Sequence, residues 1–326
     1  MWSLAALQGL WQVKSWKTNS TACPSLTELG RSHPQSTPSS GRKPMKILVL
    51  ADLHLDQISC SDFRNELGQA IEEAGREAEA LIIAGDLTER AAERWPDAIR
   101  WLNQYYPSKQ TILIPGNHDY YGGSLDSLDA ELSLICRDAG CTFGQCLNVC
   151  MGNTRILMAT LWTDMRLYEG KGAAAVAESI ENAQLLMPDY AQGAITLGAS
   201  KRPATPYDTI DAHNRQREWL VKELARPWAG KTLIVTHHTP LRSALSRNSL
   251  LSPCFASDLG AIVHEYRPDA WLFGHTHHPV SYVTISGTVL QNASLGYSDE
   301  LTGCTVTKRV RAGLIELESC AGAKPR

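Results

Sequence analysis

Side chains with the chemistry of metal ligands gather in five short clusters of this sequence. Seven of its ten histidines lie in or directly beside these clusters, which chance placement would not produce. Imidazole and carboxylate groups together suit zinc, iron, manganese, cobalt or nickel, and these ligand types do not distinguish among those metals. The sequence therefore predicts a metal site assembled from distant segments. The clusters are Asp52-Leu53-His54, Gly85-Asp86, Gly116-Asn117-His118-Asp119, Thr236-His237-His238-Thr239 and Gly274-His275-Thr276-His277.

The candidate donors are too many for one ion. They suit two divalent ions about 3.5–4 Å apart that share one carboxylate. Two such ions with two carboxylates leave about two positive charges, so the pocket would attract an anionic substrate such as a phosphoester. The seven predicted metal ligands are Asp52, His54, Asp86, Asn117, His237, His275 and His277.

The spacing within the clusters also favours a shared pocket. In an extended segment the first and third side chains point to the same side, so Asp52 and His54 would reach one pocket, as would His275 and His277. Glycine directly precedes Asp86, Asn117 and His275. A glycine there lets the backbone turn tightly and come close to the ions.

An apolar run precedes each cluster, and amphipathic stretches separate several of the runs. Short uncharged runs of this kind are typical of buried strands, and their alternation with helices predicts a parallel sheet covered on both faces. Ligands of such sheets bind beyond the carboxyl ends of the strands, where all five clusters fall. Strands are expected at 46–51, 80–84, 110–114, 146–150, 154–160, 231–236 and 269–273, helices at 61–79, 91–105, 123–138, 209–225 and 257–266, and two or more antiparallel strands within 280–318.

The composition changes along the chain in a way that predicts its organisation. Residues 1–44 contain one acidic residue and many Ser and Thr, which favours a disordered N-terminal extension. Residues 45–326 then form one domain. Within it, residues 163–206 are rich in Ala, Gly and Pro and lack a steady period, so we expect an inserted cap with one or two helices.

Overall composition narrows the class of protein. Hydrophobic residues make up 43% and charged residues 20%, which is ordinary for a globular protein, and no run of 18 uncharged apolar residues predicts a membrane span. A formal net charge of −3 does not favour stable nucleic-acid binding. The nine cysteines are odd in number and fit no zinc spacing, which favours reduced thiols and a cytoplasmic location over a structural zinc site.

Taken in order, the five clusters resemble the signature of calcineurin-like metallophosphoesterases, over roughly residues 45–295. The sequence is most similar to uncharacterised bacterial members of that family. The resemblance implies an α/β fold of the αββα sandwich type, with two central mixed sheets flanked by helices. It also implies hydrolysis of a phosphoester, with attack on phosphorus by a hydroxide that bridges the two ions.

The resemblance further implies a role for each site residue. Asp86 would bridge the ions, and His118 would hydrogen-bond a phosphate oxygen or protonate the leaving alkoxide. Glu89 or Asp119 would bond the ring of His118. The first ion would be held by Asp52, His54, Asp86 and His277, and the second by Asp86, Asn117, His237 and His275.

Three alternatives within or beside this family bear on the function. Protein serine/threonine phosphatases carry an arginine after their Asn-His-Glu block, whereas Tyr120 and Tyr121 follow Asp119 here. Nucleases of the family come with long appended domains and basic surfaces, which this sequence lacks. A non-catalytic scaffold, such as the retromer subunit, has lost catalytic groups that are all present here. We therefore expect a small-molecule phosphomonoester or phosphodiester as substrate.

Overall fold

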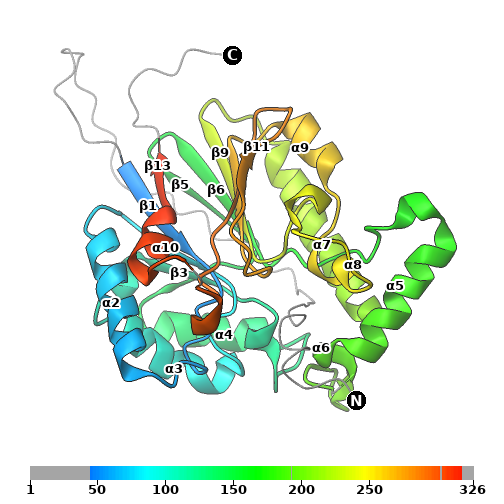
Figure 1. Ribbon diagram of the computed structural model, residues 1–326, viewed down its shortest axis with the longest axis horizontal. Coiled ribbons are helices and arrows are strands. Elements are labelled where there is room, and N and C mark those ends of the chain that lie inside the picture. Colours follow the sequence, from blue (N-terminus) through cyan, green and yellow to red (C-terminus); the bar gives the residue numbers. More distant parts are fainter. Residues whose placement is uncertain (1–44, 192, 302, 318–326) are drawn as a thin grey trace.

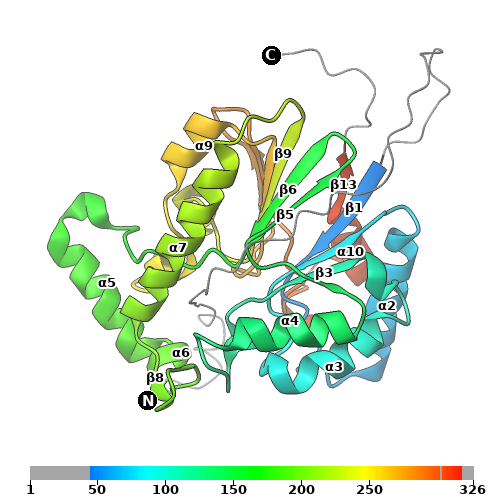
Figure 2. The same cartoon turned by 180° about the vertical axis from the view of Figure 1, so that it is seen from behind.

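Two β-sheets stacked face to face form the centre of the molecule, and helices cover both outer faces (Figures 1 and 2). The computed structural model describes residues 45–191, 193–301 and 303–317. The predicted N-terminal extension, residues 1–44, lies outside the described residues. Among the helices of the described part, none combines the length and apolar character needed to cross a membrane.

The first sheet has five strands in the order β13-β1-β2-β3-β4. Strands β1 to β4 run parallel, and β13 pairs antiparallel with the free edge of β1. A parallel sheet with both faces covered explains why its strands read as continuous apolar runs. The strands are β1 (Met45–Leu50), β2 (Leu81–Ala84), β3 (Thr111–Ile114), β4 (Thr142–Phe143) and β13 (Leu314–Leu317).

Helices α2 (Ser61–Gly75), α3 (Ala91–Leu102) and α4 (Leu128–Asp138) cover the outer face of this sheet, and α10 (Val306–Ala312) packs against α2. Helices α2, α3 and α4 are all shorter than predicted, and for α2 and α4 the backbone shows the reason. After α2 the chain turns so that Glu79 N donates to the Lys46 carbonyl of β1. Before α4, the backbone of residues 122–125 bonds to residues 194–196 and is therefore not helical.

The second sheet has six strands in the order β11-β12-β10-β9-β6-β5. Its outer face is covered by α7 (Pro206–Leu224) and α9 (Gly260–Tyr266) (Figure 2). Central strands β6, β9, β10 and β12 are parallel, and the edge strands are antiparallel. The strands are β5 (Leu147–Met151), β6 (Thr154–Ala159), β9 (Lys231–Thr236), β10 (Ala270–Phe273), β11 (Ser281–Val283) and β12 (Val289–Asn292).

The prediction of antiparallel strands over residues 280–318 is only partly right. Strands β11 and β12 form an antiparallel pair, but β12 runs parallel to β10. The last strand, β13, leaves that sheet and joins the first one beside β1. It does so because β1 is otherwise an open edge, and pairing satisfies its backbone groups. The C-terminal part of the described chain thus contributes to both sheets.

Alternation along β1 shows how the layers are held together. Ile47 and Val49 are buried between the two sheets, whereas Leu48 and Leu50 belong to the core beneath the helices of the first sheet. A third core, which includes Trp271 of β10, lies under α7 and α9. Side chains that alternate between two cores are what a strand buried on both faces requires.

The 163–206 segment contains the helices α5 (Ala173–Leu186) and α6 (Pro188–Ala191) and a two-stranded sheet of β7 (Thr196–Leu197) and β8 (Arg202–Pro203). The two helices agree with the expected number, and the small sheet was not expected. Helix α5 projects away from the sandwich (Figure 1). The short elements elsewhere are α8 (Ser252–Phe255) and the 3-10 turns Ser108–Gln110, His118–Tyr120, Glu169–Lys171, Arg242–Ala244 and Ser298–Glu300.

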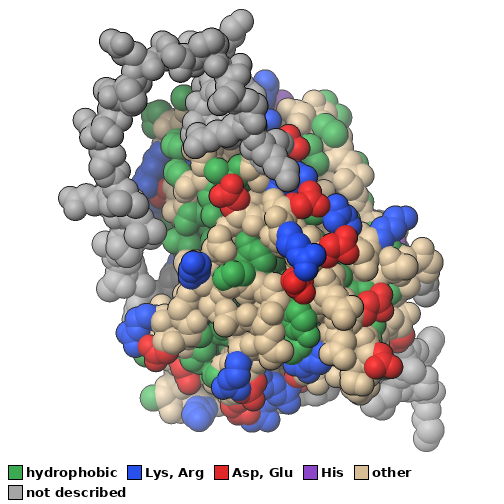
Figure 3. All heavy atoms as spheres, turned by 90° about the vertical axis from the view of Figure 1, so that its left-hand side faces the viewer, with side chains coloured by type: hydrophobic (Ala, Val, Ile, Leu, Met, Phe, Trp, Pro, Cys, Tyr) green, Lys and Arg blue, Asp and Glu red, His purple; other side chains and the backbone are tan. Residues whose placement is uncertain are grey.

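Charges of both signs are interspersed on the face formed by α2 and α10, without a patch of one sign (Figure 3). Lys46 pairs with Glu77 at 2.7 Å, and Arg311 pairs with Glu73 and Glu77 at 3.3 and 2.8 Å. Such mixed pairs give this face no extended positive field.

Candidate metal centre

All five predicted clusters meet at the carboxyl ends of the central strands. The clusters that follow β1, β2 and β3 come from the first sheet, and those that follow β9 and β10 come from the second. The site therefore lies where the two sheets converge. The predicted ligands are almost wholly buried: Asp52, His54, Asp86, Asn117, His237 and His275 expose 1% or less of their surface.

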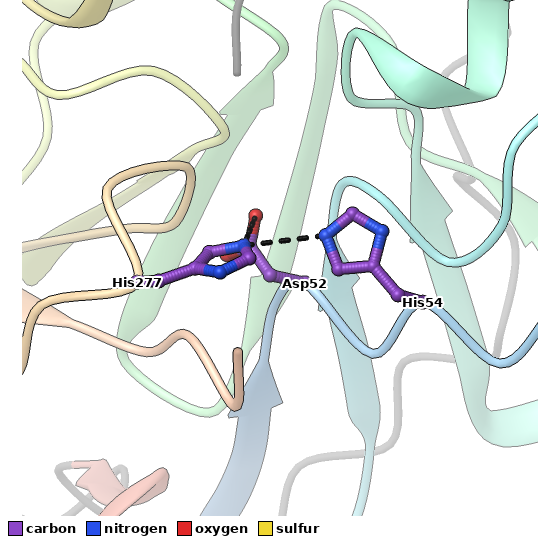
Figure 4. Close-up of side chains that lie close together, drawn as sticks. All are labelled: Asp52, His54 and His277. Carbon is purple, nitrogen blue, oxygen red and sulfur yellow. Dashed lines mark hydrogen bonds and ion pairs between the residues drawn. The ribbon is translucent and has the colours of Figure 1, made fainter. Parts of the chain in front are cut away.

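Asp52, His54 and His277 form the first group of donors (Figure 4). Their ligand atoms all lie within 4.8 Å of one another. His277 Nε2 lies 3.2 Å from His54 Nε2 and 3.4 Å from Asp52 Oδ1. Three atoms that can each donate a lone pair thus surround one small space.

Asp86, His237 and His275 form the second group, with ligand atoms again within 4.8 Å of one another. Asp86 Oδ2 lies 3.5 Å from His237 Nε2 and 3.9 Å from His54 Nε2, a residue of the first group. Asn117 Oδ1 lies 3.1 Å from His237 Nε2. Asp86 is therefore placed between the groups, and Asn117 stands beside the second one.

The backbone at these ligands differs from the expected extended form. Five of them have φ in the left-handed region: Asp52 (55°), His54 (41°), Asp86 (53°), His275 (73°) and His277 (48°). The prediction that paired side chains converge through an extended segment is therefore wrong, although the side chains do converge. A strained residue of this kind costs about 1–3 kcal/mol and persists only where the surroundings over-determine it.

Hydrogen bonds between loops supply that constraint. Asp52 N donates to the Gly85 carbonyl at 2.9 Å, and His54 N donates to the Asp86 carbonyl at 3.1 Å, so the loop after β1 is tied to the loop after β2. His275 N donates to both carboxylate oxygens of Asp52, at 3.0 and 2.8 Å. These bonds join the two sheets through the ligands themselves.

The glycines before the ligands are required by close contacts. A Cβ on Gly85 would lie 2.1 Å from His237 Nδ1, and one on Gly116 would lie 2.2 Å from Asp86 Oδ1. A Cβ on Gly274 would lie 2.6 Å from Asp52 Oδ2. Ligand side chains thus occupy the space that any larger residue would need.

The protonation of three of the histidine donors fits a cation. Burial lowers the pKa of His54, His237 and His275, that of His237 to about 4, so these rings are neutral at pH 7 and can bind a metal. His277 differs from these three, because the effect of burial is outweighed by Asp52 and Glu300, which raise its pKa to about 9. This ring is therefore protonated at pH 7 and would release a proton on binding a metal. A neutral imidazole and a carboxylate are the forms that coordinate metals.

The hydrogen bonding of two histidine donors also indicates a site for a cation. Within the described residues, neither ring nitrogen of the buried His275 has a hydrogen-bond partner. His237 Nδ1 lies 2.9 Å from the Ala84 carbonyl and donates to it, so Nε2 presents a lone pair to Asn117 Oδ1. Two acceptors that face each other at 3.1 Å need a positive charge between them, and the residues present therefore suit a metal ion.

His118 stands beside the first group, with its ring centroid 5.0 Å from that of His54. Its Nδ1 lies 3.2 Å from Glu89 Oε1, whereas the buried Nε2 has no hydrogen-bond partner among the described residues. The bond to His118 also lowers the pKa of Glu89. Of the two predicted partners of this ring, the structure therefore places Glu89 there.

Asp119 is placed differently from that expectation. Its carboxylate accepts from Asp86 N (2.8 Å), Thr88 N (3.1 Å), Gly116 N (2.8 Å) and Trp95 Nε1 (2.8 Å). Because its oxygens accept from these donors, Asp119 fixes the loops after β2 and β3. Within the part of the chain that the structure describes, it makes no hydrogen bond to the ring of His118. It is a structural residue of the site.

Three residues of the site were not predicted from the sequence. Glu300 Oε2 lies 2.6 Å from His277 Nδ1, and the ring of Tyr297 stacks on that of His54 with centroids 4.6 Å apart. Asp189 accepts from Asn117 Nδ2 at 3.2 Å. No local signal marks these residues, because each reaches the site from a segment outside the five clusters.

Comparison with known proteins identifies the family. The model of the calcineurin-like phosphoesterase family matches residues 45–279, so the chain belongs to this family of dimetal-dependent hydrolases that act on phosphoester bonds. It is 25% identical over 284 residues to an uncharacterized protein of Acanthamoeba polyphaga mimivirus, covering 78% of this chain and 93% of that protein. It is 31% identical over 81 residues to an uncharacterized metallophosphoesterase of Helicobacter pylori strain J99, covering 25% of this chain and 21% of that one.

A solved structure shares the fold. Phosphopantetheinyl hydrolase from Mycobacterium tuberculosis aligns with a TM-score of 0.60 and 19% sequence identity, over 79% of this chain and 92% of that one. The two sheets flanked by helices, which the family resemblance implied, are thereby confirmed.

Proposed function

We propose that this protein hydrolyses a small-molecule phosphoester with two divalent ions held by the two donor groups. The observation that carries the proposal is the position of Asp86 Oδ2, 3.9 Å from His54 of the first group and 3.5 Å from His237 of the second. One carboxylate can then serve both ions. Asp52, His54 and His277 would complete the first ion's ligands, and Asn117, His237 and His275 the second's.

The ions, when bound, would activate water as a nucleophile at neutral pH and offset the charge of the phosphoryl group. The chain's own residues supply the rest. His118 is held by Glu89 at Nδ1, which leaves Nε2 to hydrogen-bond a phosphate oxygen or to give a proton to the leaving alkoxide. Glu89 would stabilise the imidazolium before that transfer.

A small substrate is favoured over a nucleic acid by charge. The net charge of the chain is −3, and the face over α2 and α10 mixes both signs (Figure 3). Binding to a nucleic acid depends on neutralising many phosphates with Lys and Arg. The attraction for an anion would instead come from the metal centre itself.

A screen of the metal-reconstituted protein tests this proposal. The panel holds p-nitrophenyl phosphate, bis(p-nitrophenyl) phosphate, cyclic nucleotides, nucleoside diphosphate conjugates and, because a structural neighbour is named for it, a phosphopantetheinyl ester. His118→Ala is the blank. We expect turnover of at least one ester that depends on added metal and is lost in the blank. Protein that binds two ions yet turns over none of the panel would favour the non-catalytic scaffold instead.

A further inference from the structure

A buried carboxylate from the 163–206 segment reaches the second donor group. Asp189 lies in α6 and is fully buried. Its Oδ1 accepts hydrogen bonds from Asn117 Nδ2 at 3.2 Å and from the Tyr121 hydroxyl at 3.1 Å. The same segment is fastened nearby, because Gly122 N donates to the Ala194 carbonyl at 2.7 Å. Helix α6 is therefore held directly against the loop that carries Asn117.

The contact matters because an amide has two unlike ends. The Nδ2 end of Asn117 donates to Asp189, so its Oδ1 end points to His237 Nε2, 3.1 Å away. That nitrogen presents a lone pair, since His237 Nδ1 donates to the Ala84 carbonyl. Only in this orientation does Asn117 offer an oxygen to an ion that His237 also binds.

If the side-chain amide of Asn117 were reversed, His237 Nε2 would no longer be available to a metal ion. Rotated by half a turn, Asn117 would donate Nδ2–H to His237 Nε2 and satisfy that nitrogen without a metal. Its Oδ1 would then face Oδ1 of Asp189, and two acceptors at that distance repel. The carboxylate therefore selects between two orientations that have the same shape.

We propose that Asp189 is a positioning residue that holds the amide of Asn117 in its metal-binding orientation, so that the inserted segment helps to complete the metal centre. This inference rests on the two-metal part of the proposed function. It assigns the segment a role in the site besides any contact with substrate.

Binding of Mn²⁺ alone to the full chain tests the inference, with bound metal measured by equilibrium dialysis and elemental analysis. In Asp189→Ala we expect the second ion to bind about 10–100-fold more weakly, as is typical when a partner of a metal ligand is lost, with the first ion unchanged. Tyr121→Phe removes a second donor to Asp189 and keeps the Asn117 contact, so it should change little. Equal binding of both ions by Asp189→Ala and the wild type would overturn the inference.

A double variant separates positioning from folding. In Asp189→Ala combined with Asn117→Asp, residue 117 has an oxygen at both ends, so no wrong orientation exists. We expect this variant to bind the second ion again. If it stays defective, Asp189 acts through folding of the segment and the inference is wrong. Wild-type protein that binds two Mn²⁺ ions but hydrolyses no ester would contradict the proposed activity alone.

Discussion

His237 and His277 each have one ring nitrogen held by an acceptor of the protein and the other turned to the donors of the site. The acceptors are the Ala84 carbonyl for His237 and the Glu300 carboxylate for His277. A hydrogen bond at Nδ1 sets the tautomer and the ring plane, and it makes Nε2 a better ligand. Glu300 therefore does for the first donor group what the Ala84 carbonyl does for the second.

Removal of the Glu300 carboxylate should weaken binding of the ion held by the first donor group. In Glu300→Ala we expect Mn²⁺ to bind there about 10–100-fold more weakly, because the ring of His277 loses its orientation. Equilibrium dialysis measures the change. Asp299→Ala is the matched control, since Asp299 is an adjacent exposed carboxylate. Indistinguishable affinities of the two variants would rule out this role.

His118 should affect turnover without affecting the metals. It belongs to neither donor group, so His118→Ala should retain two ions while kcat falls about 10²–10⁴-fold, the range for loss of a general acid. Steady-state kinetics on an ester identified in the screen, with metal analysis of the same sample, gives both quantities. His264→Ala, an exposed histidine on α9, should behave as the wild type. Loss of metal in His118→Ala would contradict the assignment.

Glu89 should act through His118. In Glu89→Gln the amide oxygen can still accept from Nδ1–H, but the charge that stabilises the imidazolium is gone. We expect kcat to fall by less than in His118→Ala, with metal content unchanged. In the double variant the second substitution should add little, because residues that act through one another are not additive. Additive losses would show that Glu89 acts by another route.

At the scale of elements, the loops after the strands hold the ligands through close packing. Gly116, after β3, leaves room for Asp86, whose Oδ1 and backbone N would lie 2.2 and 2.5 Å from an added Cβ. Asp119 draws the same two loops together through their backbone N–H groups. Hydrogen bonds and close packing between these loops therefore fix the positions of the ligands that they carry.

Gly116→Ala should consequently disturb both stability and metal content. Overpacking of this kind costs about 1–3 kcal/mol of unfolding free energy, and here it displaces the shared carboxylate Asp86. Urea unfolding and elemental analysis measure the two effects. Gly170→Ala, where an added Cβ meets nothing within 4 Å, is the control and should show neither. A normal metal content in Gly116→Ala would mean that the loop adjusts freely.

At the scale of the whole molecule, the metal centre joins two sheets. Asp52, His54 and Asp86 extend from the first sheet, and His237, His275 and His277 from the second. Burial and the neighbouring carboxylates Asp52 and Asp119 raise the pKa of Asp86, because each of them disfavours its ionised form through desolvation or charge repulsion. Cations bound there would relieve that repulsion and hold the sheets together.

Chelation should therefore lower the melting temperature. An ion present at 100 times its Kd stabilises the folded chain by about 2.7 kcal/mol, and for a domain of this size that is a fall in Tm of roughly 5–10 °C when the ion is removed. Thermal unfolding with and without EDTA measures it. The His237→Ala variant should show a smaller EDTA effect. An equal effect in both would place the stabilising ion elsewhere.

Particular residues show how far the sequence allowed prediction. The strand Lys231–Thr236 and its cluster were predicted because apolar runs and their polar ends are local features. The left-handed backbone at Asp52 and His54 was not, since no rule of spacing requires a residue with a Cβ to adopt it. Nor was the joining of β13 to the first sheet, which depends on an open edge far away in the chain.

The sequence itself determined the kinds of ligand, their order and their place at strand ends. Side-chain chemistry and the residues that end a strand are local features of the chain. Tertiary structure alone decided which carboxylate contacts which side chain of the site. Glu89 rather than Asp119 contacts His118, Glu300 contacts His277, and Asp189 orients Asn117. Such contacts join segments up to 72 residues apart, and they exist only once packing has brought those segments together.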